Sequence, residues 1–100
     1  MTLRESRILF TKLIPRLIDF MFEKGYEPMT GRDGLQHRKK SLHYDGLAVD
    51  IDLTLNGKYL DKTEDHAEFG AFWESLHPLC RWGGRFKDGN HYSITYQGRM

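Results

Sequence analysis

The sequence predicts an α+β domain with a small antiparallel sheet and flanking helices. Helical patterns of apolar residues cover residues 3–24 and 64–76, and a clear alternation of apolar and polar residues covers 46–55. The order of the predicted elements is helix, small strands, helix, strands. With 100 residues, the chain has room for one core, so we expect a single domain over residues 1–100.

The first helix is predicted over residues 3–24. Thr2 and Glu5 have the spacing of a capping box, and Gly25 is typical of a helix end. Pro15 removes one backbone donor inside the pattern. We therefore expect a kink at Pro15 or two shorter helices.

The clearest strand is predicted over residues 46–55. Its alternation places one apolar face against the core and an opposite face that carries Asp50 and Asp52. The Asn-Gly pair at 56–57 is typical of a tight hairpin turn, so residues 58–60 are expected to return as a short strand.

The stretch between the first helix and this strand, residues 26–40, is polar. Residues 26–29 are a candidate short strand, residues 31–34 are typical of a turn, and residues 36–40 form a basic cluster. The net charge is only +1, from 15 Lys and Arg against 14 Asp and Glu. This balance favours a solvated loop over a nucleic-acid patch, so we expect no nucleic-acid partner.

The second helix is predicted over residues 64–76, with Thr63 as its N-cap and Pro78 after its end. The following tail alternates glycine turns with aromatic residues. Its final strand is expected to place Tyr92 on one face and His91 on the other.

Composition excludes several classes of protein. Hydrophobic residues make up 39% and charged residues 29%, which is typical of a soluble domain. No stretch approaches the roughly 18 apolar residues of a membrane span, and the first residues lack the pattern of a signal peptide. The single cysteine, Cys80, excludes an internal disulfide and is expected to be a small buried apolar residue.

Histidines and acidic residues supply candidate metal ligands. His43 and Asp50 lie on either side of Gly46, where the chain can turn and aim both side chains inward. His91 begins the last predicted strand. Two histidines and one aspartate are ligands that zinc takes in catalytic sites, with a fourth position open for water. Asp88, three residues before His91, could serve as a general base.

A structural explanation of the same residues stays open. Asp50 could pair with an arginine, and the histidines could be ordinary polar residues. A chain with five histidines and 14 acidic residues offers such triples readily, so spacing alone does not decide. The three remaining histidines, His37, His66 and His77, are expected on the surface or in helices.

Two stretches resemble motifs of zinc peptidases that act on bacterial cell-wall peptides. The pattern Ser41-x-His43-x-x-Gly46-x-Ala48-x-Asp50 is similar to the first metal motif of the family that contains the zinc D-Ala-D-Ala carboxypeptidases, the D-Ala-D-Ala dipeptidases and the phage L-alanyl-D-glutamate endopeptidases. Residues 82–92 resemble the Trp-Gly-Gly segment that precedes the last zinc histidine in the phage members. The two motifs occur in the family's order, and the resemblance covers roughly residues 3–96.

This resemblance implies a fold, a site and an activity. The implied fold is the small α+β fold shared with the Hedgehog signalling domain. The implied Zn²⁺ ligands are His43, Asp50 and His91. Asp88 matches the catalytic carboxylate. Arg32 matches an arginine that binds substrate or stabilises the oxyanion, and Arg38 is the other candidate for that role.

The implied function is hydrolysis of the stem peptide of bacterial peptidoglycan, at an L-Ala-D-Glu or a D-Ala-D-Ala bond, by a phage lysis enzyme. The alternative is a catalytically inactive, metal-stabilised binding or virion-associated module of the same fold. A phage enzyme without a signal peptide is expected in the host cytoplasm before lysis and then acts on the cell wall. We expect a monomer whose partners are peptidoglycan stem peptides, without membrane insertion.

Overall fold

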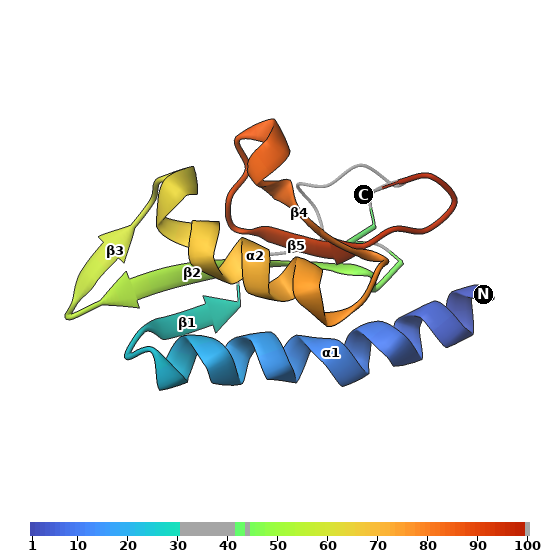
Figure 1. Cartoon of the computed structure of the whole chain (residues 1–100), viewed down its shortest axis with the longest axis horizontal. Helices are drawn as coiled ribbons and strands as arrows, with labels where there is room; N and C mark the ends of the chain where they lie inside the picture. The colour runs from blue at the N-terminus through green and yellow to red at the C-terminus, as the bar shows by residue number, and fades with distance from the viewer. Residues whose placement is uncertain (31–41, 44, 100) are drawn as a thin grey trace.

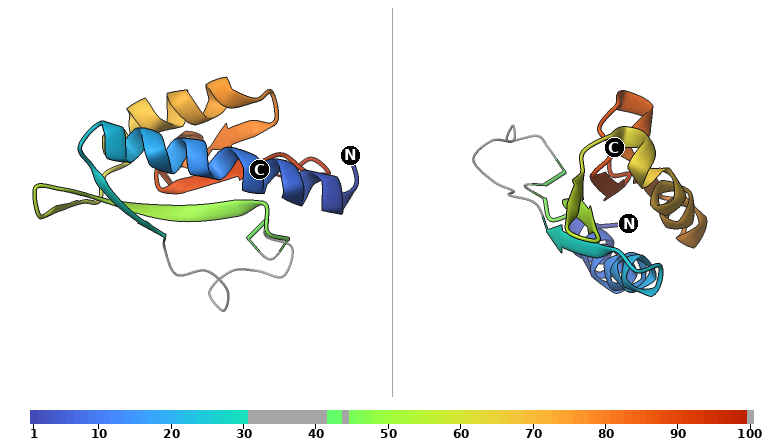
Figure 2. Two further views of the ribbon diagram at one scale, coloured as in Figure 1. Left: turned by 90° about the horizontal axis from the view of Figure 1, so that it is seen from below. Right: turned by 90° about the vertical axis from the view of Figure 1, so that its left-hand side faces the viewer.

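Two helices cover one face of a five-stranded sheet in the computed structural model, which describes residues 1–30, 42–43 and 45–99 (Figure 1). The helices are α1, Leu3–Glu23, and α2, Ala67–Leu76. The strands are β1, Glu27–Thr30; β2, Ala48–Leu55; β3, Lys58–Leu60; β4, Cys80–Trp82; and β5, His91–Ile94. Figure 2 shows α1 and α2 side by side on the same side of the sheet. The predicted α+β class is confirmed.

Helix α1 begins with the predicted capping box. The Glu5 N–H donates to Thr2 Oγ1 at 3.1 Å, and the Thr2 N–H donates to Glu5 Oε1 at 2.7 Å. The helix continues through Pro15, so the expected division into two helices is wrong. Pro15 is exposed, and water can bind the carbonyl that loses its donor there. No helix in the described residues is long and apolar enough to cross a membrane.

The sheet has the strand order β1-β2-β5-β4, and β3 pairs with β2 beyond the turn at residues 56–57. Each pair of neighbouring strands is antiparallel, as predicted. Strand β2 lies at the centre, and its register places Asp50 opposite His91. The sheet therefore brings together two residues that are far apart in the sequence.

Two local features differ from the sequence prediction. The second helical segment begins with a 3₁₀ turn over Thr63–His66, and α2 itself starts at Ala67. Lys62, and not Thr63, is the N-cap residue of this turn, and its N–H donates to Asp65 Oδ2 at 3.1 Å. Strand β4 was not predicted, because three residues are too short to show an alternation.

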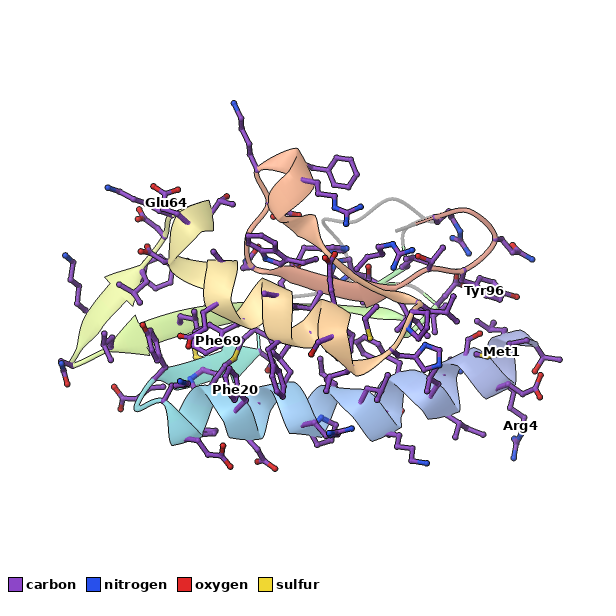
Figure 3. The ribbon with its side chains drawn as sticks, in the orientation of Figure 1. Met1, Arg4, Phe20, Glu64, Phe69 and Tyr96 are labelled. Carbon is purple, nitrogen blue, oxygen red and sulfur yellow. The ribbon has the colours of Figure 1, made fainter. Side chains whose placement is uncertain are left out.

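The core lies between the helices and the sheet. In Figure 3, Phe20 of α1 points toward Phe69 of α2, and the two rings meet edge to face with centroids 5.9 Å apart. Cys80 is fully buried, and burial raises the pKa of its thiol to about 12. This confirms its expected role as a buried apolar residue. The largest fully buried side chains are Trp73, Tyr92, Phe69, Leu17 and Met21.

Candidate metal centre

Strands β2 and β5 place two of the predicted ligands side by side. Asp50 lies directly opposite His91, and the neighbouring pair is Val49 with Tyr92. Tyr92 is on the helix side of the sheet, where its ring centroid lies 6.5 Å from that of Trp73. Because successive strand residues point to opposite faces, Asp50 and His91 point away from the helices.

The third predicted ligand, His43, lies in the turn that leads into β2. Gly46 donates its N–H to the His43 carbonyl at 3.2 Å, and Leu47 donates its N–H to the Leu42 carbonyl at 2.9 Å. Gly46 has φ +71°, a conformation that favours glycine. The turn at Gly46 thus brings His43 to the same side as Asp50, as predicted from the sequence.

The nearest polar atoms of the three side chains form an almost equilateral triangle. His43 Nε2 is 3.1 Å from His91 Nδ1 and 3.4 Å from Asp50 Oδ1. His91 Nδ1 is 3.5 Å from Asp50 Oδ1. A simple hydrogen-bonded chain requires only two of these three distances to be short.

The triangle fits a zinc ion. Donor atoms about 2.1 Å from a tetrahedral zinc lie about 3.4 Å from one another, which is close to all three distances. Two histidine nitrogens and one carboxylate oxygen are ligand atoms that zinc takes in proteins. The residues therefore form a His-Asp-His group that could hold a metal ion.

The group is shielded from solvent but not closed. The side chains of His43, His91 and Asp50 are 3%, 14% and 18% exposed. Burial of Asp50 raises the pKa of its carboxyl group, but the hydrogen bonds and charges of His43 and His91 outweigh burial and hold that pKa well below its usual range. Asp50 is therefore ionised, which is the form that binds a cation.

The Trp-Gly-Gly segment shapes the chain that leads to His91. The Trp82 indole lies between Gly70 of α2 and Gly84, and a Cβ atom on either glycine would come within 2.1 and 2.3 Å of the ring. The Trp82 Nε1–H donates to the Gly89 carbonyl at 2.7 Å. Trp82 is thus partly buried against the core and holds the loop just before His91.

We expect Gly70→Ala to destabilise the protein. An alanine in an open helix position would stabilise α2 by about 1 kcal/mol relative to glycine. Here the added Cβ meets the Trp82 ring, which Gly84 confines from the other side. We expect a net loss of about 1–3 kcal/mol, measured by urea unfolding.

The exposed Ala71 of the same helix provides the control for this measurement. Ala71→Gly should cost about 1 kcal/mol from helix propensity alone. A Gly70→Ala variant that is more stable than the native protein would show that the Trp82 ring is not confined.

Asp88 lies at the turn before β5. Its carbonyl accepts the His91 N–H at 3.1 Å, and its own N–H donates to the Gly83 carbonyl at 3.0 Å. The residue is exposed and lines a polar pocket of about 140 Å³ that also borders Asp61 and Asn90. None of the three candidate metal ligands lines this pocket, and the Asp88 carboxylate is not part of the His-Asp-His group.

Asp52 lies two residues after Asp50 in β2. It accepts hydrogen bonds from Tyr59 Oη at 3.4 Å and from Asn90 Nδ2 at 3.3 Å. Sequence reasoning missed this network. It forms only because the fold places β3 and the loop before β5 next to Asp52 of β2. The three residues His43, Asp50 and His91 are called the triad below. Asp52 shares a strand face with Asp50. The network therefore connects the strand of the triad with the wall of the polar pocket.

His66 lies in a helical turn, which is one of the two expected places, but it is buried rather than on the surface. It lies in the 3₁₀ turn, is only 3% exposed, and its Nδ1 is 2.8 Å from Tyr92 Oη. Burial lowers the pKa of its imidazole. The remaining sequence candidates lie outside the described residues: Arg32, Arg38, His37 and Ser41.

Comparisons with known proteins find no match for the chain. No family model matches the chain, and no curated protein or solved structure matches it. Fold and site together define an α+β domain with a His-Asp-His group suited to a metal ion.

Proposed function

We propose that this chain is a zinc-dependent peptidase that hydrolyses the stem peptide of bacterial peptidoglycan. The observation that carries the proposal is the triangle of His43, Asp50 and His91 donors, whose edges of 3.1, 3.4 and 3.5 Å suit tetrahedral zinc. Each of the two stretches that resemble the cell-wall zinc peptidases contains at least one of these ligands.

Three ligands leave one position of a tetrahedral site open, which is typical of catalytic zinc. When bound, zinc acts as a Lewis acid that polarises a carbonyl group and lowers the pKa of a bound water. The carboxylate of Asp88 then accepts the proton of the attacking water and passes it to the leaving amine nitrogen. Support for this role comes from the resemblance of the motif around His91 and from the exposure of the Asp88 carboxylate.

The proposal also includes a biological setting. The substrate is an L-Ala-D-Glu or D-Ala-D-Ala bond of the stem peptide, and Arg32 or Arg38 binds the substrate or the oxyanion. The enzyme is made in the host cytoplasm and reaches the cell wall at phage lysis. These statements rest on the resemblance of the two motifs.

A catalytically inactive module of the same fold is the alternative. It would keep the three metal ligands for stability and bind the cell wall or a virion component without hydrolysis. The short side chain of Asp88 favours this alternative, since aspartate is one methylene shorter than glutamate and must lie close to the metal to act as a base.

Mass spectrometry of purified muropeptides tests the proposal. We expect zinc-loaded protein to hold one zinc per chain and to convert muropeptides to shorter stem peptides. His43→Ala should lose both properties, whereas the control His77→Ala, altered outside the triad, should keep them. Zinc binding without cleavage would favour the inactive module, and failure to bind zinc would refute both functions.

A further inference from the structure

A short hairpin follows β5 at the C-terminal end of the described chain. Tyr96 and Arg99 exchange two backbone hydrogen bonds, at 3.1 and 3.0 Å, around Gln97 and Gly98, which both have positive φ. The Arg99 guanidinium also lies over the Tyr96 ring, 5.7 Å from its centroid. Figure 3 shows Tyr96 near Met1, at the end of the molecule where α1 begins. The hairpin therefore gives Arg99 a defined position.

Arg99 connects this hairpin to the turn of the metal centre. Its Nη2 lies 2.5 Å from Asp45 Oδ2, although the two residues are 54 positions apart in the sequence. Their side chains are 30% and 27% exposed, so the pair is largely shielded. A short, charge-assisted bond in such surroundings is stronger than an exposed ion pair.

Asp45 belongs to the same turn as His43. Among the described residues, the backbone hydrogen bonds of Gly46 and Leu47 help to close the turn, and Leu42 is buried beneath it. His43 is not on a strand, in contrast to Asp50 and His91. Of the three ligands, His43 thus depends most on side-chain contacts that fix its turn.

We propose that Arg99 is a positioning residue for the metal centre. By binding Asp45, it holds the turn so that His43 Nε2 stays within reach of the same ion as Asp50 and His91. The inference rests on the metal binding in the proposed function and adds a determinant that lies outside the ligand set. Partners that orient metal ligands typically contribute about 10–100-fold to metal affinity.

Zinc affinity of three variants tests this role. We expect Arg99→Gln and Asp45→Asn each to weaken zinc binding about tenfold, measured by competition with a chromophoric chelator. The double variant should be no weaker than either single variant, since both remove the same contact. Arg99→Lys keeps the charge and should restore part of the affinity.

Lys24→Gln is the matched control. It removes another ion pair, Lys24 with Glu68 at 3.3 Å, in which both side chains are about half exposed. This pair joins the residue after the end of α1 to α2, and its loss should leave zinc affinity unchanged.

Amide exchange in the metal-free protein provides a second readout. Arg99→Gln should accelerate exchange at the Gly46 and Leu47 amides, which close the turn, and should leave the Tyr26 amide unchanged. Equal zinc affinity of the native protein and both single variants would overturn the positioning role and leave the metal centre intact. A native protein that binds no zinc would overturn the positioning role together with the proposed function.

Discussion

Removal of zinc is expected to lower the melting temperature by many degrees. The ion would join the turn at His43, the central strand at Asp50 and the start of β5 at His91. A ligand that binds only the folded state at about a thousandfold excess over its Kd stabilises that state by about 4 kcal/mol. Since about 1 kcal/mol shifts the Tm of a domain of this size by roughly 4–8 °C, the expected change is roughly 15–30 °C.

Thermal melting with and without chelator measures this effect. Native protein should show the large shift, His43→Ala should show almost none, and the control His77→Ala should keep it. The stretch 83–90 before His91 is expected to lose protection from amide exchange first, whereas α1 persists. Identical melting temperatures, with zinc removal verified by metal analysis, would mean that no stabilising metal binds here.

Long repeating patterns made most of this fold predictable. The apolar spacing of residues 3–24 and the alternation of residues 46–55 report directly which face of each element is buried. The three residues of β4 are too few to carry such a pattern. For the same reason, the 3₁₀ turn before α2 could not be separated from the helix.

The candidate ligands could be proposed from the sequence, because Gly46 indicates a turn between His43 and Asp50, but spacing alone also allowed a purely structural explanation of these residues. Their approach to within 3.5 Å could not be derived, since it depends on the register of β2 against β5. Contacts across the fold leave no local signal at all. The pair of Asp45 with Arg99 is an example, because their proximity comes from the complete path of the chain.

The role of Asp88 leads to the largest expected change in activity. Replacement of a general acid–base group typically lowers the rate about 10²–10⁴-fold, because an amide cannot accept and return a proton. Asparagine has nearly the same size as aspartate, and Asp88 is exposed and outside the triad. We therefore expect Asp88→Asn to retain its fold and its zinc while kcat/KM on muropeptides falls by this factor.

Asp61 offers a matched control for this variant. It is an exposed aspartate that lines the same polar pocket as Asp88, so Asp61→Asn removes an equal charge from the same surface. A general electrostatic effect on substrate binding would lower the activity of both variants, mainly through KM. Proton transfer by Asp88 predicts that only Asp88→Asn loses kcat. If Asp88→Asn cleaved muropeptides at the native rate, another group would have to be the base.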